Sequence, residues 1–246
     1  MKPSNFIRFR CSSIGKLMTA PKLKSEVLSV GAKTYIRELA AQEIFGVDFE
    51  VSSKPMEKGL RVEDASICLL NQVRGLALSK NAERRADDYI TGECDLFDTE
   101  RRRGHDLKSS WSLATFPITE VDCENSLYEW QMRGYMRLWD AEEWEVNYAM
   151  VDTPDNLIGY EPLSMHLVSH IPEHMRLTTW RVRRDLAKEL EMVEKVKHAR
   201  LYFAEVIAEF DRSHRLEVEP PPKPTAPAVP PQASAPARAA LPESIF

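Results

Sequence analysis

The stretch GECDLFDTERRRGHDLKSSW, residues 92–111, carries charged side chains at the ends of two short apolar runs. Within it, Asp106 and Lys108 are separated by Leu107 alone. Side chains two positions apart in a strand point to the same face, so this carboxylate and this ammonium project together while Leu107 points away. Such a pair is either a salt bridge on an edge strand or part of a hydrolytic site.

A second carboxylate, Asp95, ends the apolar run that precedes this segment. If the two runs are neighbouring strands, Asp95 meets Asp106 across the ladder, and two close carboxylates repel unless a cation lies between them. Since no histidine or cysteine accompanies the pair as a ligand, oxygen donors favour Mg²⁺ or Mn²⁺ over zinc. Beside such an ion, Lys108 would orient or deprotonate an attacking water, or stabilise charge on a phosphate.

A helical segment, KGLRVEDASICLL, adds a third carboxylate. Glu63 lies in line with Leu60, Ile67 and Leu70 at helical spacing, which describes an apolar stripe. A carboxylate on such a stripe is costly to bury unless it is paired or bound to metal. Glu63 is therefore either an arginine's salt-bridge partner or a metal ligand.

A second helical segment, YEWQMRGYMRLW, repeats the pattern with an amide. Gln131 lies in line with Tyr128, Tyr135 and Leu138. A buried amide needs a hydrogen-bond partner, whereas buried tyrosines usually serve the core. We therefore assign Gln131, rather than the two tyrosines, to the site.

Helix and strand signals surround these residues. Periodicity and breakers predict helices over residues 13–19, 32–45, 56–73, 126–139 and 172–214, and strands over residues 88–97, 105–111, 144–152 and 162–169. The turn DTERRRG joins the first two strands. The pattern indicates an α/β fold with a mixed central β-sheet flanked by helices, a long C-terminal helix and one main domain over residues 1–216.

Composition limits the possible partners. The chain has 246 residues, 43% hydrophobic content and a formal charge of -5, which argues against a polycation that coats nucleic acid, so phosphate contacts must be local. Its four cysteines lack C-x-x-C spacing and are expected to be reduced. Without a leader or a run of about 18 apolar residues, we expect a cytoplasmic protein with no membrane contact.

The last part of the chain, residues 217–246, has a different composition. It contains nine of the sixteen prolines together with many alanines, so it cannot bury enough surface to offset its ordering entropy. We predict a disordered Pro/Ala-rich tail. Its end, LPESIF, is either solvated or a short motif in which Ile245 and Phe246 anchor a partner.

In order along the chain, the motifs KGLRVEDA, GECDLF, HDLKSSW and a helix with Y-x-x-Q-x-x-x-Y-M resemble the PD-(D/E)XK nuclease superfamily. They look most like its lambda-exonuclease and YqaJ-like viral recombinase branch, over about residues 9–152. The resemblance implies a restriction-endonuclease-like core. It also implies a set of roles in which the metal is bound by Glu63, Asp95, Asp106 and the main-chain carbonyl of Leu107, Lys108 serves the nucleophile and Gln131 lines the site.

The resemblance extends to DNA contacts. The N-terminal segment RFRCSSIGKLM is similar to one that binds a DNA 5′-phosphate, which implies Ser13, helped by Arg10 or Arg8. In the turn beside the proposed site, Arg102 and Arg103 either hold phosphates or form a solvated basic turn. Two departures leave the ligand chemistry intact: Cys94 replaces the motif proline, and Asp106 stands where the lambda enzyme has glutamate.

Together with the metal site that the residues indicate, the resemblance implies a Mg²⁺-dependent exonuclease that degrades linear double-stranded DNA from its ends for phage-type recombination. By resemblance, it would act 5′ to 3′ and assemble as a homo-oligomer, a trimeric ring. One alternative is a structure-specific or single-strand endonuclease of the same superfamily. Another is a nonenzymatic DNA-end-binding scaffold whose tail recruits a single-strand annealing or single-strand-binding protein.

Overall fold

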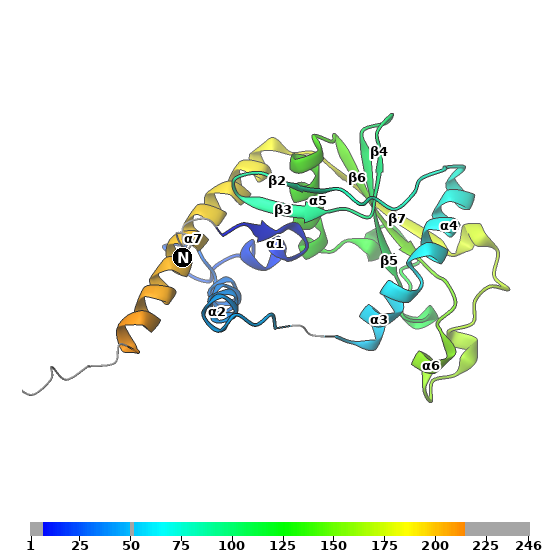
Figure 1. Ribbon diagram of the computed structural model, residues 1–246. Helices are drawn as coiled ribbons and strands as arrows, with labels where there is room; N and C mark the ends of the chain where they lie inside the picture. Colours follow the sequence, from blue (N-terminus) through cyan, green and yellow to red (C-terminus); the bar gives the residue numbers. More distant parts are fainter. Residues whose placement is uncertain (1–6, 50–51, 215–246) are drawn as a thin grey trace, which may run out of the picture. The chain divides into compact units, whose positions relative to one another are not determined.

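Two small β-sheets form the centre of the protein, and helices pack against them (Figure 1). The computed structural model describes residues 7–49 and 52–214. Through Ser213 the chain is one compact unit. The predicted tail, with Ile245 and Phe246, lies outside the described residues and stays a prediction.

The smaller sheet has the order β1-β3-β2 and joins the N-terminal segment to the middle of the chain. Its strands are β1 (Phe9–Arg10), β2 (Arg84–Ala86) and β3 (Ile90–Glu93). β1 runs parallel to β3, and β2 runs antiparallel to it.

The larger sheet has the order β4-β5-β6-β7 and is mixed, as predicted. Its strands are β4 (Leu96–Asp98), β5 (Arg103–Ser109), β6 (Glu143–Ala149) and β7 (Leu177–Arg183). β4 and β5 form an antiparallel hairpin, β5 and β6 are parallel, and β7 closes the sheet antiparallel to β6. β5 therefore has a strand on both sides over Arg103–His105, and its later part, which carries Asp106 and Lys108, pairs with β6 alone.

Seven α-helices surround the sheets in the part of the chain that the structure describes. They are α1 (Cys11–Leu17), α2 (Val30–Phe45), α3 (Lys54–Arg61), α4 (Glu63–Arg74), α5 (Ser126–Trp139), α6 (Asp155–Ile158) and α7 (Leu186–Ser213). α1 packs against α5, the long α7 packs along α2, and α3 and α4 contact β5 (Figure 1). None of the described helices is both long and apolar enough to cross a bilayer.

Local signals explain where the predicted helices begin and end. The Ser29 hydroxyl accepts a hydrogen bond from the N–H of Ala32 at the start of α2, and Gly46 ends that helix with φ of 65°. Asn125 caps α5 by accepting from the N–H groups of Leu127 and Tyr128. Both helices match the sequence prediction closely.

The core beside the larger sheet is aromatic. Trp144 of β6 is fully buried and its ring packs against Tyr135, Trp139 and Phe97. Gly104 of β5 lies directly beneath this ring, and a Cβ added there would stand 2.1 Å from it. This close approach requires glycine two positions before Asp106.

Two predicted elements divide where the sequence suggested continuity. The helix expected over residues 56–73 breaks at Val62 into α3 and α4, which leaves Leu60 79% exposed and makes Glu63 the first residue of α4. The strand expected over residues 88–97 divides at Cys94 and Asp95, so that its halves, β3 and β4, belong to different sheets.

Two predictions in the C-terminal half were wrong. Residues 162–169 form no strand: Leu163–Met165 is a short 3-10 helix, and the carboxylate of Asp152 accepts from the N–H groups of Val168 and Ser169 instead of a strand partner. The helix predicted over residues 172–214 begins only at Leu186, because β7 precedes it. Pairing of LTTWRVR with β6 overrides the apparent helical spacing of Trp180.

Candidate active site

β5 presents Asp106 and Lys108 on the sheet face that α5 covers, as the two-residue spacing predicted. The Lys108 ammonium lies 2.6 Å from Asp106 Oδ2 and 4.5 Å from the centre of the Tyr128 ring. Asp106 is only 1% exposed. Although burial alone would lower the pKa of Lys108, the carboxylate of Asp106 raises it above its ordinary value, which keeps the ammonium charged.

α5 supplies the amide that orients this aspartate. Gln131 is buried, and its Nε2 donates to Asp106 Oδ1 at 3.2 Å and to the Tyr135 hydroxyl at 3.2 Å. That hydroxyl in turn donates to the main-chain oxygen of Glu93 at 3.0 Å. The chain of contacts fixes the carboxylate of Asp106 between a helix and two strands.

Asp95 lies at the junction of the two sheets and reaches the same strand. Its Oδ2 accepts a hydrogen bond from the N–H of Leu107 at 2.7 Å. Burial, and next the negative charge of Asp106, raise the pKa of Asp95 to about 7. The two carboxylates therefore repel each other, as expected of a pair that lacks sufficient positive charge. The Leu107 side chain points to the opposite face and packs near Ile67 and Leu70.

Glu63 joins this neighbourhood from the first turn of α4. Its carboxylate pairs with the ammonium of Lys80, and both charges act on Asp95. Ile67 and Leu70 are buried as the predicted stripe requires, but Leu60 belongs to α3 and faces solvent. Lys80 was missed because it lies in an irregular segment between α4 and β2, where no periodicity marks it.

The acidic side chains do not form a ready-made metal cluster: within residues 7–49 and 52–214, no three His, Cys, Asp or Glu side chains are grouped to hold an ion. Each has another partner: Lys80 for Glu63, the Leu107 N–H for Asp95 and Lys108 for Asp106.

The chemistry of these donors nevertheless fits a hard divalent cation. The donors are carboxylate oxygens and a main-chain carbonyl, and burial raises the pKa of the adjacent Cys94 thiol to about 12, which keeps it protonated and a poor ligand. Buried Asp106 Oδ2 accepts no well-formed hydrogen bond despite its ion pair with Lys108. The raised pKa of Asp95 shows that the charge of Lys108 does not fully offset the two neighbouring carboxylates, which is what a site for a further positive charge would produce.

The N-terminal residues assigned to a DNA 5′-phosphate lie at the start of α1, which packs against α5. Ser13 and Arg10 both act on the Tyr35 hydroxyl: burial raises the pKa of Tyr35, and these two neighbours oppose that rise. Arg8 instead donates from Nε to the main-chain oxygen of Asp87 at 2.6 Å. Ser13 and Arg10 thus both lie near Tyr35, whereas Arg8 is directed at the segment that precedes β3.

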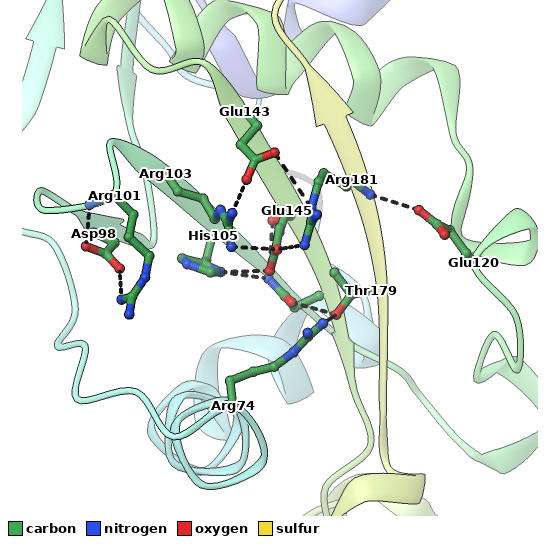
Figure 2. Close-up of polar contacts among 11 residues, drawn as sticks. Arg74, Asp98, Arg101, Arg103, His105, Glu120, Glu143, Glu145, Thr179 and Arg181 are labelled. Atoms are coloured by element: carbon green, nitrogen blue, oxygen red, sulfur yellow. Dashed lines mark hydrogen bonds and ion pairs between the residues drawn. The ribbon is translucent and has the colours of Figure 1, made fainter.

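The arginines of the β4–β5 turn already have acidic partners. Figure 2 shows Arg103 and Arg181 directed at Glu143 and Glu145, with His105 beside Glu145. Burial alone would raise the pKa of Glu145, but hydrogen bonds from His105 and Arg181 lower it to about 2.

Arg102 of the same turn lies 2.6 Å from Asp140 Oδ2. Any phosphate contact by Arg102 or Arg103 would therefore compete with these ion pairs.

No family model matches the chain, and comparison with curated proteins finds no match. Among solved structures, it is similar to a phage-related exonuclease from Haemophilus somnus 129PT, with 34% identity and a TM-score of 0.79 over 83% of this chain and 97% of that chain. An alkaline exonuclease (LHK-Exo) from Laribacter hongkongensis shares the fold at 14% identity, with a TM-score of 0.63 over 85% of this chain and 94% of that chain. The structure of LHK-Exo in complex with dAMP gives 17% identity and a TM-score of 0.61 over the same shares of the two chains.

Proposed function

Because the chain belongs to the lambda-exonuclease and YqaJ-like branch of the PD-(D/E)XK nuclease superfamily, we propose that it is a Mg²⁺-dependent exonuclease that degrades linear double-stranded DNA from its ends. The observation that carries the proposal is the buried Asp106, held by Lys108 and Gln131 and repelled by Asp95. The proposed polarity is 5′ to 3′, and the single-stranded tails would serve phage-type recombination.

In the proposed phosphodiester hydrolysis, the residues of the candidate site have separate roles. Glu63, Asp95, Asp106 and the Leu107 carbonyl would hold the metal. A bound Mg²⁺ supplies Lewis acidity to the scissile phosphate and lowers the pKa of a water. Mn²⁺, which prefers the same oxygen donors, should substitute for it.

Lys108 acts as a charged donor in this scheme. Because the carboxylate of Asp106 keeps its ammonium protonated, Lys108 is suited to orient the attacking water and to stabilise negative charge on the phosphate rather than to remove a proton. Gln131 keeps Asp106 Oδ1 in place, which leaves Oδ2 facing Lys108.

Ser13 and Arg10 are proposed to bind the 5′-phosphate of the DNA end. A guanidinium beside a hydroxyl matches a terminal phosphate in charge and in hydrogen bonding. Arg8 would take part only if it exchanged its bond to the Asp87 carbonyl for one to DNA. A homotrimer and recruitment of an annealing or single-strand-binding protein by residues 217–246 complete the proposal.

One experiment separates the exonuclease from its alternatives. Purified protein is incubated with Mg²⁺ and either 5′-phosphorylated linear duplex or covalently closed plasmid. The proposal expects mononucleotides from the linear duplex and no change in the plasmid. Nicking of the plasmid would indicate an endonuclease, and binding of ends without hydrolysis would indicate a scaffold.

A further inference from the structure

Lys58 of α3 is a cation buried without a carboxylate partner. Its side chain is 0% exposed, and its ammonium donates to the main-chain oxygens of Ser110 at 2.6 Å and Trp111 at 3.1 Å. Among the described residues, no acidic group lies within ion-pair distance of it. Desolvation lowers the pKa of Lys58 to about 8, opposed only weakly by the charge of Asp152.

The two carbonyls that Lys58 binds end the strand that carries the candidate active site. Ser110 and Trp111 follow β5 directly, and Ser110 continues its ladder by donating its N–H to the Ala149 carbonyl at 3.1 Å. The Trp111 oxygen also accepts from the hydroxyl of Thr153 at 3.2 Å. The ammonium thus fixes the end of β5 just beyond Lys108.

The backbone of the same lysine closes α3 immediately before the helix that carries Glu63. The Lys58 carbonyl accepts from the N–H of Val62 at 3.0 Å, and Val62 is the residue between α3 and α4. One turn into α4, the Ser66 hydroxyl lies 3.0 Å from the hydroxyl of Ser109 on β5. Lys58 therefore connects the α3–α4 junction, next to Glu63, to the end of β5, two residues beyond Lys108.

Stability alone does not account for a lysine at this position. An unpaired charge is costly to bury, and an apolar side chain of similar length usually fits such a site at less cost. What an apolar side chain could not provide is a pair of strong hydrogen bonds that hold the strand end against the helix start.

We propose that Lys58 is a positioning residue for the metal site, and that its ammonium holds the start of α4 and the end of β5 at the separation at which Glu63, Asp95 and Asp106 share one cation. This inference rests on the proposed function. Carboxylates that repel one another need an external restraint to remain close before the cation binds, and the contacts of Lys58 supply one.

Lys195 of α7 offers a matched control. It is 8% exposed, burial lowers its pKa, and its ammonium donates to the main-chain oxygen of Thr19 at 3.1 Å. Like Lys58, it is a buried lysine whose ammonium donates to a main-chain carbonyl. Its partner lies in the segment after α1, whereas the partners of Lys58 directly follow β5. Lys58→Met and Lys195→Met therefore make the same chemical change at two places.

The test measures Mn²⁺ binding by calorimetry without DNA, and then the Mg²⁺ concentration that gives half-maximal cleavage of linear duplex. For Lys58→Met we expect the Mn²⁺ affinity to fall, and the Mg²⁺ concentration for half-maximal cleavage to rise, by about tenfold or more. This is the usual effect of losing a group that orients metal ligands. Lys195→Met should leave both within about twofold of the original protein, even if its thermal midpoint falls. Lys58→Arg, which keeps a charged donor, should restore part of the affinity.

Unchanged Mn²⁺ affinity and Mg²⁺ dependence in Lys58→Met would overturn the inference while leaving the nuclease assignment intact. If the unmodified protein neither binds Mn²⁺ nor cleaves DNA, the proposed function fails first and the inference fails with it. Should Lys58→Met not fold, Lys58→Gln, which retains an N–H donor, is compared with Lys195→Gln in the same two measurements.

Discussion

The carboxylate of Asp95 accepts a hydrogen bond of 2.7 Å from the main-chain N–H of Leu107, and this contact ties the junction of the two sheets to the strand between Asp106 and Lys108. It places two acidic side chains in one buried region, where each disfavours the charge of the other. The arrangement is costly for folding and useful for binding a cation.

The hydrogen bond from Gln131 to Asp106 should matter more for catalysis than the hydrogen bond from Gln131 to Tyr135. Gln131→Met removes the donor to Asp106 but keeps most of the volume, so we expect the turnover number to fall by about tenfold or more, as for other residues that orient ligands. The measurement is steady-state kinetics on linear duplex. Tyr135→Phe, which removes only the hydroxyl beside Gln131, is the matched control and should change turnover less. Equal losses in both variants would contradict this role.

Gly104 should be essential for stability rather than for chemistry. Because a Cβ at Gly104 would overlap the buried Trp144 ring, we expect Gly104→Ala to lower the free energy of unfolding by about 3 kcal/mol. Gly59 of α3 has no atom near its would-be Cβ, and Gly59→Ala should raise stability by about 0.5–1 kcal/mol. Urea unfolding of the two variants checks both signs, and a tolerated Gly104→Ala would show that this core can expand.

Glu145 should make stability depend on acid pH. Its pKa is about 2 in the folded protein and near 4.5 when unfolded, so the stability that its charge contributes is fully present above about pH 5 and is lost as the pH falls toward 2. Glu145→Gln should cost on the order of 2 kcal/mol at pH 7, and the difference should shrink in acid. Urea unfolding at several pH values tests this, and a difference that does not change with pH would refute it.

Lys58 should make the free energy of unfolding depend on pH in the alkaline range. Its pKa is about 8 when folded and about 10.5 when unfolded, so between these values the unfolded chain binds more protons and folding becomes more favourable as the pH rises. Relative to Lys58→Met, the unmodified protein should gain about 2 kcal/mol between pH 8 and pH 10. Unfolding curves at both pH values give the answer, and a constant difference would mean that the buried ammonium titrates normally.

How much of this could be predicted from the sequence depends on whether a feature is local. The helix over residues 126–139 was predicted because its cap, its apolar stripe and its end are all local signals, and the same-face pairing of Asp106 with Lys108 follows from the period of a strand. The segment of β7 has helical spacing in the sequence, but its stability as a strand comes from pairing with residues of β6 that lie 28 to 40 positions earlier.

The residues of the candidate site also differ in whether the sequence could predict them. Asp95, Asp106 and Gln131 were singled out by their positions in or beside regular elements, and the structure brings them together. Lys80 and Lys58 were missed because what distinguishes them, a contact with Glu63 and a contact with the end of β5, exists only in the folded chain. Lys54, four residues before Lys58, is exposed, and nothing in the sequence distinguishes the two.

The most direct test of the account compares Asp106→Asn, Lys108→Met and Asp98→Asn on 5′-phosphorylated linear duplex, with Mg²⁺ and with EDTA. Asp98 is the matched control, since it is 5% exposed on the adjacent strand β4 and pairs with Arg101 at 2.8 Å. We expect Asp106→Asn and Lys108→Met to fold but to lose nucleotide release by about a hundredfold or more, Asp98→Asn to keep most of it, and EDTA to abolish it. Release at the original rate by both Asp106→Asn and Lys108→Met would contradict this expectation.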